Sequence, residues 1–178
     1  MESVVGQKHF TFRDIEIDGD LQSLCDKLVS IGYSFEYFND DRHSAVLTGT
    51  FAGKDYCEIY LINSKLIDKV WKVVVFIPAQ ASWTLLKQDY DFFKSVCLKK
   101  YGNPQSYEFF QHPYIEGDGK ELKALENEMC TYSSYWFMKS GSVTVDINSF
   151  KQVSIAYEDA LNIGLKDVAE EEAAALDI

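Results

Sequence analysis

Two segments of the chain place apolar residues at the three- and four-residue spacing of an amphipathic helix. The apolar positions of the first are Leu21, Leu24, Cys25 and Leu28. Those of the second are Leu86, Tyr90, Phe93, Cys97 and Tyr101. Asp18 and Ser82 are the expected N-caps, because their side chains can accept the free N–H groups of a first turn. Gly32 and Gly102 follow as stop signals. The pattern therefore predicts two helices, each with one buried face.

Elsewhere the hydrophobic period changes to two, which is typical of strands with one covered face. The predicted strands are 34–38, 45–52, 56–62, 69–77, 105–110, 130–138, 142–148 and 152–158. A weaker helix is expected over 119–128, and a peripheral helix over 165–176. Many antiparallel strands with few helices exclude a parallel doubly wound fold. We therefore predict an α+β fold, in which the helices pack on one face of a single curved, mostly antiparallel sheet.

The two halves of the chain match each other in sequence. Ser34–Phe38 resembles Ser106–Phe110, and the same offset places Leu24-Cys25 on Val96-Cys97. A second set of positions matches once an insertion near 112–125 is allowed: Phe51, Cys57, Ile59 and Leu61 with Phe137, Val143, Val145 and Ile147. We therefore predict two tandem helix-plus-four-strand repeats, 20–77 and 82–158. They would form a single domain, 1–160, followed by an acidic C-terminal tail, 161–178, that is helical or frayed.

Composition excludes several classes of protein. The chain has 178 residues, of which 47% are apolar, so it can bury a sizeable core and is not a disordered chain. No apolar run has the length of a membrane-spanning helix, so membrane insertion is not expected. The formal net charge is −11, with 17 Lys+Arg against 28 Asp+Glu. Nucleic acid is therefore a poor partner, because phosphate backbones require a basic surface.

The cysteines and the N-terminus bear on the cellular compartment. The four cysteines are widely spaced and form no C-x-x-C pair: Cys25, Cys57, Cys97 and Cys130. Buried free thiols are the favoured interpretation, and two disulfides in an oxidising compartment are the alternative. The segment 1–8 has no signal-peptide pattern. We expect a cytoplasmic protein, or a periplasmic or envelope protein if an export signal has been removed.

No motif for catalysis, phosphate binding or metal binding is present. The chain lacks G-x-S-x-G, S-x-x-K and Walker A patterns. Glu116-Gly117-Asp118-Gly119 has no lysine and reads as a surface turn. His9, His43 and His112 lie in a terminal segment and two loops, with no spacing that indicates a dyad. Asp40-Asp41 and Asp18-Gly19-Asp20 do not follow a calcium-loop spacing. No cofactor and no metal are expected.

Four stretches carry a distinctive succession of turns and apolar anchors. They are Phe12-x-x-Ile15-x-Ile17-Asp18-Gly19-x-Leu21, Leu47-Thr48-Gly49-Thr50-Phe51-Ala52-Gly53, Trp83-x-x-Leu86-x-x-x-Tyr90 and Lys100-Tyr101-Gly102-Asn103-Pro104. In them, over about residues 10–158, the chain resembles an uncharacterised small domain family of gut Bacteroidota and their mobile elements. The resemblance implies a bacterial protein but no particular activity. The tandem architecture is also similar to that of the β-lactamase inhibitor proteins, a likeness of fold that does not specify function.

The aromatic residues are the most unusual feature, with 12 Phe, 11 Tyr and 3 Trp. If Cys57, Ile59 and Leu61 face the helices, the pleat sends their neighbours to the opposite, open face. The predicted binding residues on this face are Tyr56, Glu58, Tyr60, Trp136, Thr144 and Asp146. Trp136 belongs there only if Tyr135 and Phe137 are buried. Alternatively, the C-terminal helix or a second copy covers the face.

The open face favours a non-enzymatic binding domain, such as an inhibitor, immunity-type or accessory protein of a bacterial or phage system. Its partner would be another protein or a small ligand. The alternative is a small hydrolase-like enzyme with an acid/base cleft beside the 112–125 insertion. A third class, a structural module that forms a homo-oligomer, would use a large contact between copies.

Overall fold

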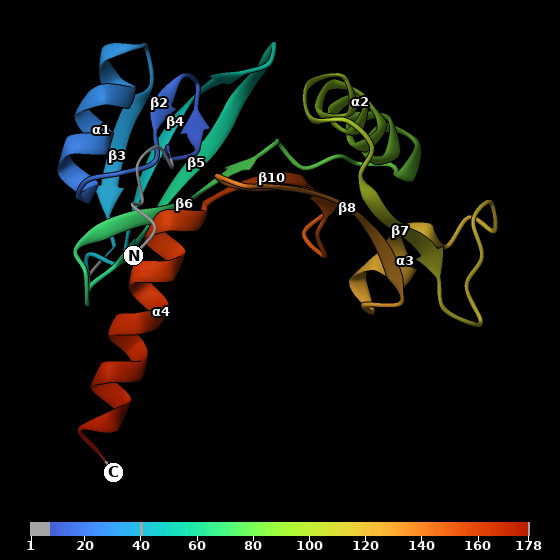
Figure 1. Ribbon diagram of the computed structural model, residues 1–178. Coiled ribbons are helices and arrows are strands. Elements are labelled where there is room, and N and C mark those ends of the chain that lie inside the picture. The colour runs from blue at the N-terminus through green and yellow to red at the C-terminus, as the bar shows by residue number, and fades with distance from the viewer. Residues whose placement is uncertain (1–7, 40, 178) are drawn as a thin grey trace. The chain divides into compact units, whose positions relative to one another are not determined.

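In the computed structural model, residues 8–39 and 41–177 are described. Segment 1–7, where no export signal is expected, and Asp40 of the dismissed calcium motif lie outside them. The helices of the described part are α1 (Leu21–Ser30), α2 (Trp83–Tyr101), α3 (Glu121–Glu126) and α4 (Ala160–Ala175) (Figure 1). A short ribbon of β1 (Thr11–Phe12) and β2 (Ile15–Glu16) precedes α1.

Among the described residues, the main sheet is open and antiparallel and contains eight strands. They are β3 (Ser34–Phe38), β4 (Ser44–Phe51), β5 (Lys54–Ser64), β6 (Lys69–Phe76), β7 (Gln105–Phe110), β8 (Cys130–Met138), β9 (Gly141–Ile147) and β10 (Val153–Asp159). Their order across the sheet is β3-β4-β5-β6-β10-β9-β8-β7. The predicted α+β class with an antiparallel sheet is confirmed.

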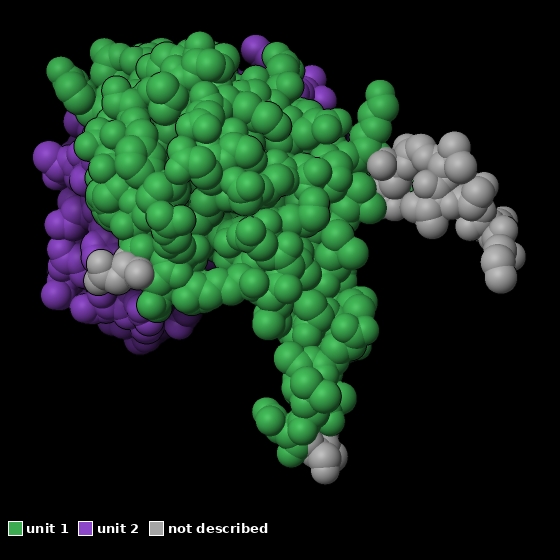
Figure 2. Space-filling model, turned by 90° about the vertical axis from the view of Figure 1, so that its left-hand side faces the viewer, with its two compact units in different colours: residues 1–75, 137–142, 156–178 green, residues 76–136, 143–155 purple. Residues whose placement is uncertain are grey.

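The chain divides into two compact units (Figure 2). The first contains the chain up to Val75, together with 137–142 and 156–178. The second contains 76–136 and 143–155. The first unit therefore includes the turn between β8 and β9 and the whole of α4, in addition to the first half of the sequence.

Helix α1 begins two residues later than the sequence suggested. The carboxylate of Asp20 accepts the Ser23 backbone N–H at 2.8 Å, so Asp20 is the N-cap. Asp18, the expected cap, instead lies 2.6 Å from the Lys69 ammonium. The four predicted apolar positions are all buried, and this face of the helix packs on β3, β4 and β5.

Helix α2 follows the predicted pattern at both ends. Ser82 is the N-cap and accepts the Leu85 backbone N–H at 3.3 Å. Gly102 ends the helix with a φ of 87°, a left-handed value that favours glycine. Four of the five predicted apolar positions are buried, and Tyr101 is half-buried.

In the first unit, strands β4 and β5 build the covered face of the sheet. Cys57, Ile59 and Leu61 are completely buried, as predicted, and Leu47 lies opposite Ile59. Gly49 lies opposite Cys57, and a Cβ at Gly49 would stand 2.6 Å from the Tyr33 ring. Glycine is therefore required for the ring to pack on the strand.

In the second unit, a polar network lies between α2 and the sheet. The Tyr90 hydroxyl lies 2.7 Å from Ser134 Oγ and donates to Glu108 Oε1 at 3.0 Å. Lys94 forms an ion pair with the same carboxylate. Ser134 is completely buried, and its hydrogen bonds make a polar side chain tolerable there. The predicted apolar positions of β9 (Val143, Val145 and Ile147) are buried.

All four cysteines are buried and free. Burial, together with Asp26 and Asp20, raises the pKa of Cys25 to about 11. Burial raises the pKa of Cys97 to about 11 against the nearby Lys100 charge, and with Glu116 it raises that of Cys130 to about 12. The thiols therefore behave as small apolar side chains rather than as nucleophiles.

Two further expectations concern helices. The helix expected over 165–176 is α4, which begins at Ala160 because the Asp159 carboxylate caps it and accepts the Asn162 N–H at 2.8 Å. No helix in the described part of the chain is both long and apolar enough to span a membrane.

Candidate functional site

The structure places three of the predicted binding residues together on β5 of the first unit. Tyr56 is 88% exposed, Glu58 is exposed and Tyr60 is half-buried. They alternate with the buried residues Cys57 and Ile59, so the predicted orientation of this strand is confirmed.

The strand register adds residues that the sequence did not reveal. Thr48 of β4 lies opposite Glu58, and its hydroxyl donates to Glu36 Oε1 at 2.6 Å. Tyr37 and Tyr60 both lie opposite Val46, so the two tyrosines share a face of the sheet. We refer to Glu36, Tyr37, Thr48, Glu58 and Tyr60 as the tyrosine face.

A β-bulge places Tyr37 on this face. The pairing of β3 with β4 shifts between Phe35 and Tyr37. Phe35 lies opposite the buried Leu47, and without the bulge Tyr37 would point in the same direction as Phe35. The extra residue, Glu36, turns Tyr37 to the other side, where 52% of it remains exposed.

The Tyr60 phenol is held in its neutral form. Burial raises its pKa, and the neighbouring Glu58 and Tyr37 raise it further, to about 12. Tyr60 therefore offers an aromatic body and a neutral hydroxyl at physiological pH. Such a group is suited to surface recognition rather than to proton transfer.

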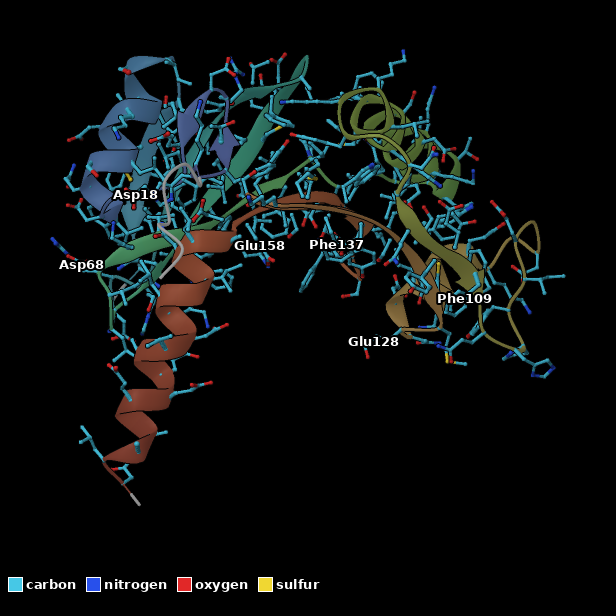
Figure 3. The ribbon with its side chains drawn as sticks, in the orientation of Figure 1. Asp18, Asp68, Phe109, Glu128, Phe137 and Glu158 are labelled. Carbon is cyan, nitrogen blue, oxygen red and sulfur yellow. The ribbon has the colours of Figure 1, made fainter. Side chains whose placement is uncertain are left out.

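The prediction that Trp136 lies on the open face of the sheet is wrong. Trp136 is 2% exposed, and its indole N–H donates to the Gly102 carbonyl at 2.8 Å. Phe137 is 70% exposed in its place (Figure 3). Tyr135, Trp136 and Phe137 are all aromatic, so hydrophobicity alone could not indicate which of them is buried.

Thr144 and Asp146, the remaining predicted residues, lie on β9 in the second unit and are half-buried. Asp146 accepts a hydrogen bond from the Ser154 hydroxyl of β10. This bond ties Asp146 to a neighbouring strand.

Helix α4 contacts another part of the first unit. The Lys166 ammonium lies 5.4 Å from the centre of the Trp71 ring on β6. A pocket of about 390 Å³ lies here. Its lining includes His43, Asn63, Trp71, Lys166 and Glu170. Within the described chain, the buried Oδ1 of Asn63 has no hydrogen-bond partner.

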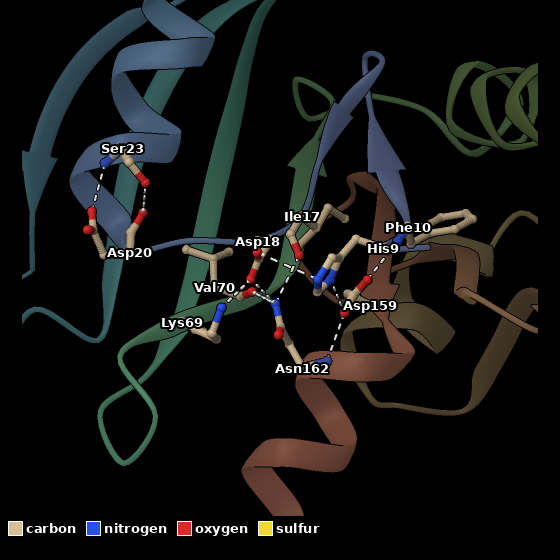
Figure 4. A network of polar contacts seen from close by, with 10 residues as sticks. All are labelled: His9, Phe10, Ile17, Asp18, Asp20, Ser23, Lys69, Val70, Asp159 and Asn162. Atoms are coloured by element: carbon tan, nitrogen blue, oxygen red, sulfur yellow. Dashed lines mark hydrogen bonds and ion pairs between the residues drawn. The ribbon is translucent and has the colours of Figure 1, made fainter. Parts of the chain in front are cut away.

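A polar network around Asp159 joins the N-terminal segment to α4 (Figure 4). Asp159 is completely buried and accepts the Phe10 backbone N–H at 2.6 Å. His9 Nδ1 lies 3.1 Å from the same carboxylate, and His9 Nε2 lies 3.6 Å from Asp18. Sequence spacing could not indicate this arrangement, because His9 and Asp159 are 150 residues apart.

Asn162 completes this network. Its side-chain amide donates to the carbonyl oxygens of Ile17 at 3.0 Å and Val70 at 2.9 Å. Burial would raise the pKa of Asp18, but hydrogen bonds from Lys69, Gly19 and Asn162, together with the His9 charge, lower it to about 2. Most of these contacts hold backbone groups or cap a helix, so we assign the network a structural role.

The second unit contains a larger pocket beside the predicted insertion. It has a volume of about 590 Å³ and lies between α2 and residues 116–121. Its lining residues are Trp83, Thr84, Lys87, Gln88, Asp91, Glu116, Gly117 and Glu121. The alternative function predicts a cleft beside this insertion, and that function stays a prediction; His112 does not contribute to the lining of the pocket.

Comparison of the chain with family models, with curated proteins and with solved structures finds no match. Among residues 8–39 and 41–177, no group of three or more His, Cys, Asp and Glu side chains is placed to hold a metal ion. The resemblance stated from the sequence stays a prediction, and the functional argument depends on the site geometry.

Proposed function

We propose that the protein is a non-enzymatic protein-binding domain of a bacterial or phage system, and that it binds through the tyrosine face. The observation that supports this most directly is the alignment of Tyr37 and Tyr60 opposite Val46, with Glu36 and Glu58 on the same three strands. Tyrosine combines apolar contact area with a hydrogen-bonding hydroxyl at low entropic cost, and it is enriched at interfaces.

The charges of the face indicate the chemistry of the partner. Glu36 and Glu58 bring two carboxylates close to two partly exposed rings. A basic, partly apolar protein surface would complement them. The net charge of −11 would also accelerate the approach of a basic partner.

Affinity capture from the cells that encode the protein, followed by mass spectrometry, tests the proposal. The bait variant Glu36→Lys/Glu58→Lys reverses the charge of the face. Glu171→Lys/Glu172→Lys makes the same charge change on the exposed part of α4 and is the matched control. We expect the native chain and the control to retain one basic partner, and the face variant to lose it by about tenfold or more. Equal retention by both variants would refute the proposal, provided that both melt like the native chain.

The hydrolase-like alternative is favoured by a separate observation, the pocket beside the insertion, which contains Glu116 and Glu121. This function requires turnover of an ester, glycoside or peptide substrate that is lost in Glu116→Gln. If the native chain hydrolyses no member of a panel of ester, glycoside and peptide substrates, this function is excluded. The structural-module alternative requires a stable homo-oligomer, which sedimentation analysis would detect.

We also propose that the two halves arose by tandem duplication, as 20–77 and 82–158. The strand order supports this, because β3-β4-β5-β6 is followed across the sheet by β10-β9-β8-β7. Each half runs from a helix through four strands, and α3 lies in the predicted insertion. Superposition of the two halves in a crystal structure, without the insertion at 112–125, would support the duplication. Different helix placements would contradict it.

The four buried, free thiols suit a reducing compartment, and we propose that the protein acts in the cytoplasm. Fractionation of the native cells tests this location. Recovery in the envelope fraction would contradict it.

A further inference from the structure

The pocket of the second unit has two walls of different character. Helix α2 provides Trp83, Lys87 and Asp91, which are four residues apart and therefore lie along one side of the helix. The segment before and at the start of α3 provides Glu116 and Glu121. We call this site the acidic pocket. Its volume of about 590 Å³ is in the range of small-molecule binding sites.

Glu121 is a buried carboxylate with spare hydrogen-bonding capacity. It is 9% exposed, and its Oε1 accepts the Gly117 backbone N–H at 2.7 Å. Within the described part of the chain, its other oxygen has no hydrogen-bond partner. An ionised carboxylate can accept several hydrogen bonds, and Glu121 lines the pocket, so its second oxygen can accept a further hydrogen bond from a ligand there.

The other two carboxylates of the acidic pocket are held in place by protein donors. Glu116 Oε2 accepts the Tyr132 hydroxyl at 3.1 Å, and Asp91 pairs with Lys87 at 2.9 Å. Three carboxylates against one ammonium leave two net negative charges. The site therefore attracts positive charge and repels phosphate or carboxylate ligands.

Trp83 adds an aromatic surface that is fixed in position. Its ring packs edge-to-face against Phe110 at 5.3 Å and against Tyr132 at 5.0 Å. An indole ring beside carboxylates is the combination that binds ammonium and guanidinium groups, through cation–π attraction and charge-assisted hydrogen bonds.

A metal ion fits these residues poorly. Among the described residues, no three acidic or other ligating side chains converge closely enough to coordinate one. Carboxylates on separate walls suit a longer ligand, whose apolar stem can lie beside the indole while its charge reaches the acids.

We propose that the acidic pocket binds an organic cation, an ammonium or guanidinium group carried on an aliphatic chain. This chemistry is available in a free polyamine or in a lysine or arginine side chain of another protein. The site is separate from the tyrosine face and does not depend on the function proposed for it.

Calorimetric titration of the full chain at low salt tests the proposal. The probes are spermidine, a free polyamine, and the capped tripeptide acetyl-Gly-Lys-Gly-amide. A tripeptide with norleucine in place of lysine has the same stem without the charge. We expect at least one cationic probe to bind and the norleucine peptide not to bind. Binding of spermidine alone indicates a free polyamine ligand, and binding of the lysine peptide indicates a partner's side chain.

Three variants locate the binding. Glu121→Gln should weaken it by about tenfold, since a charge-assisted hydrogen bond is lost. Glu171→Gln removes the same charge from the exposed surface of α4 and should leave the affinity unchanged. Lys87→Met removes the competing ammonium and should tighten binding several-fold.

Absence of binding by both cations at millimolar concentration would overturn the proposal. Equal weakening by Glu121→Gln and Glu171→Gln would also overturn it, because the attraction would then come from net charge alone. If melting shows that Glu121→Gln does not fold, the Lys87→Met variant tests the site instead. Weaker cation binding by Lys87→Met than by the native chain would refute the site.

Discussion

The carboxylate of Asp159 accepts the backbone N–H of Phe10 at 2.6 Å, although 149 residues separate the two positions. The same side chain caps α4 through the N–H of Asn162. One buried carboxylate therefore fixes the segment before β1 and the start of the last helix within the first unit.

The first prediction concerns this carboxylate. Asp159→Ala should lower the free energy of unfolding by about 2–4 kcal/mol, because a helix cap is lost and buried N–H groups lose their acceptor. Urea denaturation monitored by circular dichroism measures the change. Asp167→Ala, at an exposed position on the same helix, should cost less than about 0.5 kcal/mol. Similar losses in the two variants would contradict the structural role of Asp159.

The second prediction concerns the length of α4. A chain that ends at Gly164 keeps Asp159 and Asn162 and loses mainly exposed residues. It also loses the contact of Lys166 with Trp71. We expect a cooperative thermal transition, with a loss of about 1 kcal/mol from a total of about 5–15 kcal/mol. A broad, non-cooperative transition would show that residues after Gly164 belong to the core.

The third prediction is a pH dependence at Asp18. Its folded-state pKa of about 2 lies below the ordinary value of 3.8, so its ionised form stabilises the fold. This contribution is complete above the unfolded pKa and is lost as the pH falls from about 4 toward 2. Because the side chain is 32% exposed, solvent screening reduces it to about 1–2 kcal/mol.

Unfolding of the native chain and of Asp18→Asn across this pH range measures the contribution. The difference in stability should be present at pH 7 and disappear near pH 2. Asp14→Asn, in an exposed turn, is the control. A difference that persists unchanged at pH 2 would contradict the assignment.

The fourth prediction compares two adjacent aromatic residues of β8. Trp136→Ser should cost about 3–5 kcal/mol, because a buried ring and its hydrogen bond to Gly102 are lost. Phe137→Ser should cost less than about 1 kcal/mol, because most of that ring is already exposed. Thermal melting of the two variants distinguishes them. A larger loss of stability in Phe137→Ser than in Trp136→Ser would show that Phe137, rather than Trp136, faces the core.

The fifth prediction concerns the thiols. Native protein at pH 8 should react slowly with an aromatic disulfide reagent, because burial raises the pKa values of Cys25, Cys97 and Cys130 and blocks access. After unfolding in urea, all four thiols should react rapidly. Rapid reaction of any thiol in the native state would contradict its burial.

The elements of the fold were predictable because helices and strands leave different hydrophobic periods in the sequence. Which residues of β5 face the core was also predictable, since polar side chains separate Cys57, Ile59 and Leu61. Which residues of β8 face the core was not predictable, because Ser134 is buried against Tyr90 while Phe137 is exposed. There the usual relation between polarity and burial is reversed.

The rest of the site depends on contacts that a local pattern does not encode. The position of Tyr37 on the tyrosine face depends on a bulge at Glu36, and bulges have no fixed sequence signature. The acidic pocket depends on how the insertion folds against α2. The cap of α1 is Asp20, whereas Asp18 pairs with Lys69, 51 residues away, which a local pattern does not show.

The strand order also affects the solubility of the chain. Strands β3 and β7 are the outermost strands of the described sheet, so each has an edge without a neighbouring strand. Both are short, with 5 and 6 residues, and rich in aromatic side chains. Such edges are prone to pair with other chains and to start fibrillar aggregation. Glu36 places one negative charge within β3, and charge at an edge strand opposes such pairing. In β7 the Glu108 carboxylate is instead paired with Lys94 of α2. We therefore expect Glu36 to oppose the pairing of β3 with another chain, whereas β7 has no such unpaired charge among Gln105–Phe110.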